Sequence, residues 1–211
     1  AFENLSKGMI MNSMKIYPGM TSQPYKGMKE GRSIYLKESD RELTATSFPD
    51  HIIQTGATVS KSDVILTYGK EALSIGINGV FPNYPSLEAI KIKEERFVHA
   101  RAKDERRKII VLHDKTVKNL FPHTSPIGKY LNAQGVPYQV VGIYTDQNSF
   151  SPSALVPFTT LQTIYQKGDS IDNITFTTKG LADEATNEQF EAEYRQALGL
   201  KKQFSPTDEG A

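Results

Sequence analysis

Residues 108–121 read KIIVLHDKTVKNLF, in which a short apolar run passes directly into a helical pattern. The four apolar residues IIVL predict a strand that is buried on both of its faces. In the segment that follows, Val117, Leu120 and Phe121 fall on one side of a helix, which Pro122 would end. A buried strand that leads straight into an amphipathic helix indicates a fold of mixed α and β structure.

Strand patterns lie on both sides of this unit. Upstream, runs rich in β-branched residues predict three strands, separated by turns at residues 61–62 and 69–70. Downstream, two runs on either side of Gln134-Gly135 predict a hairpin, and a short apolar run before Pro157 predicts a further strand. The predicted strands are residues 51–59, 63–68, 73–81, 130–132, 138–144 and 154–156.

Helical patterns lie towards both ends of the chain. Residues 2–13 predict an amphipathic helix, and residues 40–48 predict a second, shorter one. Near the C-terminus, Thr186 and Gln189 match a capping box, which predicts a helix that starts at Thr186 and ends before Gly199. Together with the strands, these helices predict an α+β fold.

The composition excludes several classes of protein. The chain has 211 residues, 38% of them hydrophobic, which is enough to bury a core. The 25 Lys and Arg against 24 Asp and Glu give a net charge of +1, which argues against a general nucleic-acid binder. The absence of cysteine removes disulfides, thiol nucleophiles and cysteine-ligated zinc. With no initiator Met, signal peptide or membrane span in the sequence, we expect a segment of a larger protein.

Candidate catalytic groups are few. The chain has no phosphate-binding loop and no nucleophile elbow. His113, Asp114 and His123 have the side chains of a metal site, and Ser125 with His113 and Asp114 has those of a nucleophilic triad. Neither set has the spacing typical of such sites. The sequence therefore favours a protein that is not an enzyme and that holds no metal.

Residues 91–108 form a stretch of mixed charge with eight basic and four acidic residues. Because its carboxylates have cationic neighbours, a solvated ion-paired surface is favoured over acid catalysis. Phe97 is its one aromatic residue, which argues against stacking on nucleic-acid bases. The stretch is instead a candidate partner interface, through Arg96, Arg101, Arg106 and Arg107.

Six segments between Arg96 and Thr160 resemble, in order and spacing, the periplasmic core domain of MacB-type ABC transporter permeases, within the FtsX-like permease family. The sequence departs from the family pattern at three turns, where Glu95 and Pro122 replace glycines and Ser125 replaces an aspartate. The matching segments are residues 96–97, 104, 108–121, 125–129, 136–143 and 154–160.

The resemblance implies structural roles and no catalytic residue. Gly128 and Gly142 match turn or close-packing positions, Phe121 matches a core position, and Pro157 lies in a matching strand-end segment. The implied fold is a two-lobed extracytoplasmic α+β domain.

The two lobes implied by the resemblance have different positions in the chain. A Porter-like α/β lobe, residues 1–85 plus 169–211, would adjoin the membrane stalks. A Sabre-like lobe of mixed α and β structure, residues 86–168, would be inserted into it. We expect the crossings at Pro82-Asn83-Tyr84-Pro85 and Gly168-Asp169.

The resemblance also implies a function and partners. The chain would lie on the periplasmic side of the bacterial inner membrane and transmit ATP-driven motion to an exported substrate or a partner protein. Expected partners are a cytoplasmic ATPase subunit or domain, which would bind the ATP, a periplasmic adaptor or lipoprotein-type protein, and a second permease copy, with no nucleic acid. Two alternatives stay open: an FtsX-like permease for lipoprotein release or cell-wall regulation, and a soluble small-molecule-binding α/β domain.

Overall fold

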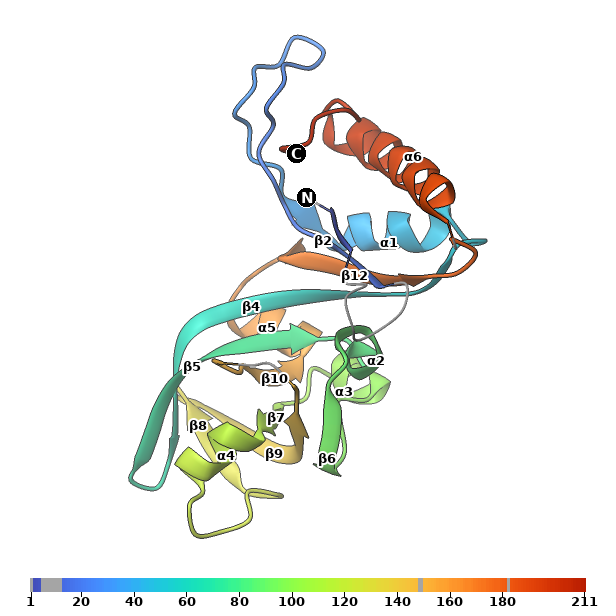
Figure 1. Ribbon diagram of the computed structural model, residues 1–211. Helices are drawn as coiled ribbons and strands as arrows, with labels where there is room; N and C mark the ends of the chain where they lie inside the picture. The colour runs from blue at the N-terminus through green and yellow to red at the C-terminus, as the bar shows by residue number, and fades with distance from the viewer. Residues whose placement is uncertain (1, 5–12, 148–149, 182) are drawn as a thin grey trace. The chain divides into compact units, whose positions relative to one another are not determined.

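The computed structural model describes residues 2–4, 13–147, 150–181 and 183–211. The chain divides into two compact units. The terminal unit comprises Ala1–Ala57 and Asp169–Ala211, and the inserted unit comprises Thr58–Gly168. Both contain helices and strands, so the predicted α+β fold class is confirmed (Figure 1).

The terminal unit is a sheet covered by two helices. Its strands run in the order β1-β2-β12-β4, and two further strands, β3 and β11, pair separately. Figure 1 shows α1 and α6 on one face of this sheet. The strands are β1 (Phe2–Asn4), β2 (Ser13–Ile16), β3 (Leu36–Lys37), residues 52–57 of β4 (Ile52–Tyr68), β11 (Ser170–Ile171) and β12 (Asn173–Thr178); the helices are α1 (Glu38–Ser47) and α6 (Glu184–Lys202).

Aromatic side chains form the centre of the terminal unit. The Phe48 and Phe190 rings meet edge to face, with centroids 5.3 Å apart. Phe176 of β12 lies 5.5 Å from the ring of Tyr194, whose hydroxyl is 2.7 Å from Oγ1 of Thr44. Because burial raises the pKa of Tyr194, its hydroxyl stays neutral and serves as a hydrogen-bonding group that joins α6 to α1.

In the inserted unit the strand pairing closes into a ring, in the order β4-β5-β10-β7-β9-β8 and back to β4. The pairs β5–β10 and β7–β9 are parallel, and β6 pairs with residues 142–145 of β9, beyond the residues 136–139 that pair with β8. Each of the six strands thus has a pairing partner on both of its sides. The elements are residues 58–68 of β4, β5 (Glu71–Val80), β6 (Lys91–Glu95), β7 (Ile109–His113), β8 (Tyr130–Ala133), β9 (Val136–Thr145), β10 (Ala154–Pro157), α2 (Tyr84–Glu88), α3 (Ala100–Asp104), α4 (Asp114–Leu120) and α5 (Phe158–Ile164).

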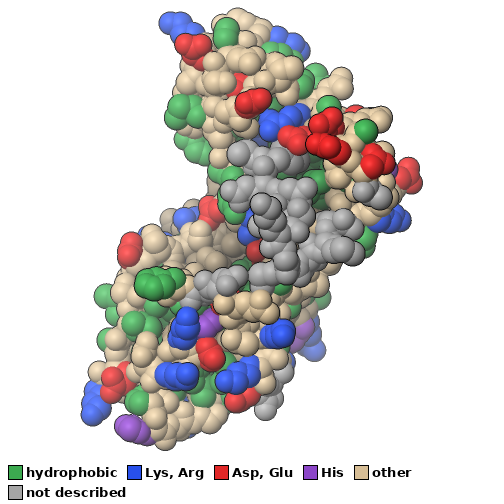
Figure 2. Space-filling view, viewed as in Figure 1, with side chains coloured by type: hydrophobic (Ala, Val, Ile, Leu, Met, Phe, Trp, Pro, Cys, Tyr) green, Lys and Arg blue, Asp and Glu red, His purple; other side chains and the backbone are tan. Residues whose placement is uncertain are grey.

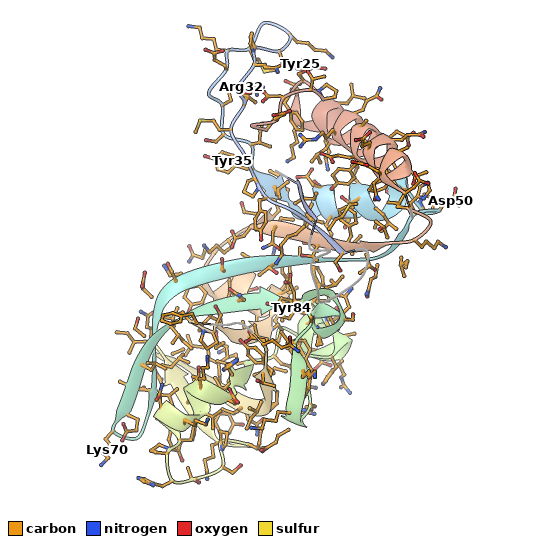
Figure 3. The ribbon with its side chains drawn as sticks, viewed as in Figure 1. Tyr25, Arg32, Tyr35, Asp50, Lys70 and Tyr84 are labelled. Atoms are coloured by element: carbon orange, nitrogen blue, oxygen red, sulfur yellow. The ribbon has the colours of Figure 1, made fainter. Side chains whose placement is uncertain are left out.

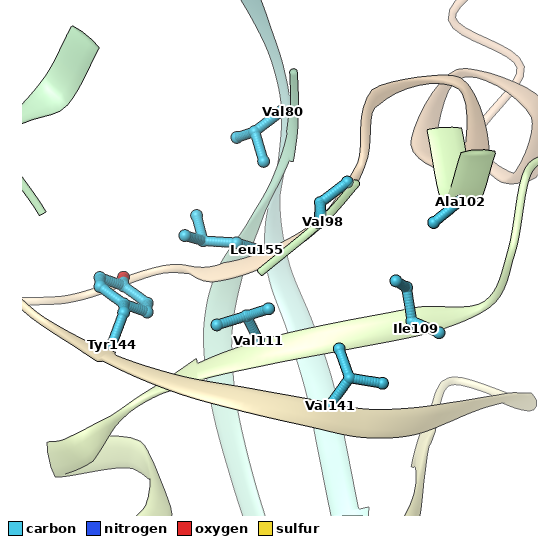
Figure 4. Packing of buried hydrophobic residues seen from close by; sticks show 8 residues of the cluster. All are labelled: Val80, Val98, Ala102, Ile109, Val111, Val141, Tyr144 and Leu155. Atoms are coloured by element: carbon cyan, nitrogen blue, oxygen red, sulfur yellow. The ribbon is translucent and has the colours of Figure 1, made fainter. Parts of the chain in front are cut away.

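Strand β7 is buried on both faces, as the apolar run predicts. Ile110 and Leu112 are fully buried on one face, and Val111 is fully buried on the other. Figure 4 shows the cluster on the side of Val111, which α3 and β9 complete. Its buried members are Val80, Val98, Ala102, Ile109, Val111, Val141, Tyr144 and Leu155.

Two predicted strands are one. Residues 52–68 form the single strand β4, and the predicted turn at residues 61–62 is wrong. The register shifts between Lys61 and Val64, where Asp63 adopts a left-handed φ of 56°. A β-bulge places one extra residue in the strand and lets pairing with β5 continue. The predicted turn at residues 69–70 and the hairpin around Gln134-Gly135 are confirmed.

Two predicted helices differ at their ends. Phe2–Asn4 are a strand rather than part of the predicted helix 2–13, and residues 5–12 lie outside the described residues. Helix α6 begins two residues before Thr186, because Asp183 is the cap and accepts a hydrogen bond from the Thr186 N–H at 2.8 Å. The helix also continues past Gly199 to Lys202. After the helix the chain turns back and packs against Gly199, where an added Cβ would lie 2.8 Å from the Phe204 carbonyl oxygen.

The first boundary between the compact units lies between Ala57 and Thr58. Residues 58–85 belong to the inserted unit, because β5 pairs with β10 along its C-terminal half and packs against α5. The second boundary lies between Gly168 and Asp169. The lobe boundaries that the resemblance implies, at residues 82–85 and 168–169, stay predictions.

Candidate interaction surfaces

The four arginines predicted as a partner interface lie on and around α3 of the inserted unit, and all are exposed. Glu105 lies between two of them, with Oε1 2.5 Å from Nε of Arg101 and Oε2 2.6 Å from Nη2 of Arg107. These two hydrogen bonds hold the pKa of Glu105 below its ordinary value. Arg96 follows the last residue of β6, and Arg106 turns the chain after α3 with a φ of 50°. The arginines thus form an exposed, partly ion-paired surface, and their role as an interface stays a prediction.

The near-neutral charge of the chain conceals an asymmetry between the units. The inserted unit has 14 Lys and Arg against 9 Asp and Glu, a formal charge of +5. The terminal unit has 11 against 15, a formal charge of −4. On the face seen in Figure 2, Lys and Arg side chains are spread over the inserted unit, and Asp and Glu side chains gather on the terminal unit. A partner of either charge would therefore distinguish the two units.

His113 is a structural residue at the junction of β7 and α4. Its side chain is 1% exposed, and Nδ1 accepts a hydrogen bond from the Lys115 N–H at 3.1 Å, which caps α4. Nε2 faces Oδ1 of Asp146 at 3.4 Å, and the ring packs edge-on against Tyr144. Burial and this cap withdraw the imidazole from any substrate.

The other candidate catalytic groups are not assembled. His123 and Ser125 are exposed in the turn after α4, and Ser125 Oγ accepts from the Ile127 N–H at 3.4 Å. No hydrogen bond in the described part of the chain joins either of them to His113. Within the same residues, no group of three His, Asp or Glu side chains is placed to hold a metal ion.

Glycine is required at positions 128 and 142 for different structural reasons. Gly128 has a φ of 78°, a left-handed conformation that side chains disfavour, and its N–H donates to the Val140 carbonyl at 2.8 Å. Gly142 lies on β9 opposite β6, where an added Cβ would overlap the carbonyl oxygen of Arg96. The first glycine permits a turn, and the second permits two backbones to approach.

Phe121 and Pro157 lie in the interior of the inserted unit. Phe121 is 4% exposed, and its ring centroid is 4.2 Å from that of Tyr68 on β4. Pro157 is buried at the end of β10, opposite Val80 of β5, and α5 begins immediately after it. Both residues join elements of the unit to one another.

No sequence motif indicates a functional role for residues 17–35, here called the arm. They run from β2 out to a tip and back to β3, and Figure 1 shows them as a long loop beside the C-terminal end of α6. Backbone hydrogen bonds join its two sides, among them Thr21 N–H to Arg32 and Ile34 N–H to Gly19. The arm is therefore an irregular hairpin with a defined outer face.

The arm is fastened to the C-terminal segment, residues 203–211, by a buried carboxylate. Asp208 is fully buried and accepts hydrogen bonds from Ser22 N–H at 2.9 and 3.0 Å, Ser22 Oγ–H at 2.6 Å and Gln23 N–H at 3.1 Å. Burial opposes its charged form, but these bonds and one from Gly210 outweigh that effect, so the pKa of Asp208 lies below its ordinary value. Arg32 adds a hydrogen bond from Nη2 to the Gln203 carbonyl at 2.5 Å.

A small apolar pocket, partly open to solvent, lies at the base of the arm. Ile16, Leu36, Leu198 and Phe204 line it, together with Arg195. Because Arg195 binds Glu191 at 3.0 Å and the Asp208 carbonyl at 3.3 Å, this cation joins α6 to the C-terminal segment.

The fold is that of the extracytoplasmic domains of ABC transporter permeases. It matches the crystal structure of the periplasmic region of MacB from Actinobacillus actinomycetemcomitans with a TM-score of 0.77 and 22% identity, over 95% of this chain and 89% of that one. It matches the extracellular domain of the noncanonic ABC-type transporter YknZ from Gram-positive bacteria with a TM-score of 0.75 and 19% identity, over 92% and 97%.

Sequence comparison identifies the family. Residues 2–197 match the MacB-like periplasmic core domain, and the chain belongs to that family. It is 25% identical over 210 residues to the macrolide export ATP-binding/permease protein MacB of Aggregatibacter actinomycetemcomitans, covering 96% of this chain and 31% of that protein. It is 26% identical over 157 residues to the MacB of Mannheimia succiniciproducens, covering 72% and 24%.

A third relative has a different name. The pyoverdine export ATP-binding/permease protein PvdT of Pseudomonas aeruginosa is 26% identical over 93 residues, which cover 44% of this chain and 14% of that protein. The chain thus spans about a third or less of the length of these curated relatives. Among its described residues, no helix is both long enough and apolar enough to cross a membrane.

Proposed function

We propose that the chain is the non-catalytic periplasmic domain of an exporter permease and that it transmits ATP-driven motion outside the inner membrane. Membership of the MacB-like periplasmic core domain family over residues 2–197 supports this place in a transporter. ATP would bind to a separate cytoplasmic domain or subunit, and the periplasmic domain would need no cofactor of its own.

The insertion of one compact unit into the other is the observation that carries the mechanism. The first crossing, between Ala57 and Thr58, lies inside the continuous strand β4. At the second crossing, the Asp169 carbonyl accepts from the Glu38 N–H at 2.9 Å, and its carboxylate lies 3.1 Å from Nζ of Lys37. A displacement of the terminal unit would therefore reach the inserted unit through a paired strand and an anchored loop.

The placement of the polar groups supports a role without catalysis. His113 caps a helix, Glu105 is paired with two arginines, and Asp208 holds the arm. Catalysis requires groups that are positioned towards a substrate and free to exchange protons with it. Each of these groups makes hydrogen bonds or ion pairs within its own unit.

The names of the relatives suggest the substrate class. Relatives named for macrolide export and for pyoverdine export point to organic molecules larger than ordinary metabolites. We extend that class to the transporter of which this chain would be a part. It would act as a dimer with a periplasmic adaptor, and the arginine surface around α3 is the predicted contact.

An insertion at the second crossing tests the proposal. In the parent transporter, six Gly and Ser residues between Gly168 and Asp169 should abolish export and leave ATP hydrolysis, because the nucleotide sites are elsewhere. The matched control is the same insertion between Gly69 and Lys70, an exposed turn within the inserted unit, which should leave export intact. Unchanged export with the first insertion, in a protein that circular dichroism shows to be folded, would refute mechanical transmission through this crossing.

A further inference from the structure

The outer face of the arm exposes large apolar side chains. Met20 bridges to Ser33 across the arm, and residues two apart along a strand share a face, so Tyr35 lies on the face of Met20. Met20 is 56% exposed and Tyr35 is 71% exposed. Figure 3 shows Tyr35 at the base of the arm and Tyr25 near its tip. The inward positions Thr21 and Ile34 are buried, so the arm has one apolar inner face and one exposed outer face.

The arm has the opposite charge to the unit that carries it. Residues 17–35 contain Lys26, Lys29 and Arg32 against the single acid Glu30, a formal charge of +2. The rest of the terminal unit has 8 Lys and Arg against 14 Asp and Glu. Lys26 and Lys29 are exposed at the tip, and Nζ of Lys26 lies 5.2 Å from the ring centre of Tyr25.

This combination of side chains is the one that suits a membrane–water interface. Tyrosine rings and long basic side chains are favoured there, because an apolar body faces the lipid while a polar end stays in water. Basic residues also concentrate near anionic headgroups. The buried Asp208 holds this face in place, so little ordering is required when it binds.

We propose that the arm binds the anionic lipid surface of the membrane beside which the domain works. The inference rests on the proposed function and on the position beside the membrane stalks that the family resemblance implies for residues 1–85 and 169–211. A lipid surface is favoured over a protein partner because stable protein interfaces bury roughly 800 Å² on each side. The outer face of the arm is a narrow strip around Met20 and Tyr35, and a fluid bilayer needs no matching shape.

Flotation of the 211-residue chain with vesicles tests the proposal. Vesicles of phosphatidylethanolamine and phosphatidylglycerol should bind the chain at low salt, and binding should fall at high salt and with neutral phosphatidylcholine vesicles. The double variant Lys26→Glu/Lys29→Glu should weaken binding at least tenfold. Met20→Ser/Tyr35→Ser should weaken it to a similar extent, while salt dependence persists.

The inserted unit offers a matched control. Ile65 and Tyr130 are 48% and 62% exposed there, and Ile65→Ser/Tyr130→Ser should bind vesicles as the parent chain does. Absence of binding to anionic vesicles, or equal binding by the arm and control variants, would overturn the proposal. The charge variant keeps the test valid if the apolar one unfolds, since its two positions are at the exposed tip. Failure here leaves the coupling test at Gly168 unaffected, so the two proposals fail separately.

Discussion

Replacing Asp208 by asparagine should loosen the arm without unfolding the rest of the terminal unit. The carboxylate accepts hydrogen bonds from Ser22, Gln23 and Gly210, all of them charge-assisted. Such bonds contribute about 1.5–3 kcal/mol each. When the arm opens, its polar groups bind water instead, so the loss of stability cannot exceed the free energy that opens the arm. The asparagine amide would direct its N–H groups at backbone N–H donors. We expect the free energy that keeps the arm closed to fall by about 2 kcal/mol, which raises the equilibrium constant for opening roughly 30-fold.

Hydrogen exchange of the arm amides measures this effect directly. The N–H groups of Thr21, Gly31 and Ile34 donate across the arm, and their protection should fall roughly 30-fold in Asp208→Asn. The neighbouring exposed acid gives a matched control, because Glu209→Gln should leave the protection unchanged. Equal protection of the arm in Asp208→Asn and the parent chain would refute the assigned role of the carboxylate.

The effect should also depend on pH, with a sign fixed by the pKa. Because the pKa of Asp208 is lowered in the folded state, its contribution is complete above its unfolded pKa of about 3.9 and is lost as the pH falls through the folded value. The difference between the parent chain and Asp208→Asn should therefore be large at pH 6 and shrink below about pH 4. A difference that grows on acidification would contradict this linkage.

Three further substitutions test the packing, each followed by urea unfolding with circular dichroism. Gly142→Ala should lower the free energy of unfolding by about 2–4 kcal/mol, because the new Cβ overlaps the Arg96 carbonyl oxygen and forces β6 away from β9. A loss below about 0.5 kcal/mol would refute the close approach of the two strands. Gly128→Ala should cost only about 1 kcal/mol, since its φ of 78° is disfavoured for alanine but nothing lies within 4 Å of the new Cβ. Tyr194→Phe should cost about 1–2 kcal/mol through loss of the buried hydrogen bond to Thr44, and an unchanged midpoint would contradict that bond.

The elements with strong local patterns could be predicted from the sequence. The apolar run at residues 109–112 predicts burial on both faces, and the helix that follows has its apolar residues at helical spacing. Gln134-Gly135 supplies the two positive φ angles that a tight hairpin turn needs, and both adopt them. In each case the determining information lies within about ten residues of chain.

The continuity of β4 could not be predicted in the same way. Lys61-Ser62-Asp63 is polar and suits a turn as well as a bulge, because each needs one residue with unusual backbone angles. The choice is made by β5, which pairs on both sides of the irregularity. The position of the first unit boundary follows from the same long-range pairing.

The attachment of the arm gave no local signal at all. Ser22 and Asp208 are 186 residues apart in the sequence, and an aspartate in a polar C-terminal segment resembles any solvated acid. The predicted arginine surface is the opposite case. A run of charged residues is easily seen in the sequence, but the partner that it would bind is another molecule. Sequence patterns therefore located the charged surface but not the arm.

The central claim is that nucleotide binding in the cytoplasm moves the two units of this domain relative to each other. The chain has no cysteine, so spin labels placed at Asp50→Cys and Lys70→Cys would be unique within it. Both positions are exposed, one in each unit, and Figure 3 marks them. The measurement is the distance distribution between the labels in the parent transporter, without nucleotide and with ATP trapped. We predict a shift of the distribution on trapping, and the same distribution in both states would contradict a movement of the units relative to each other.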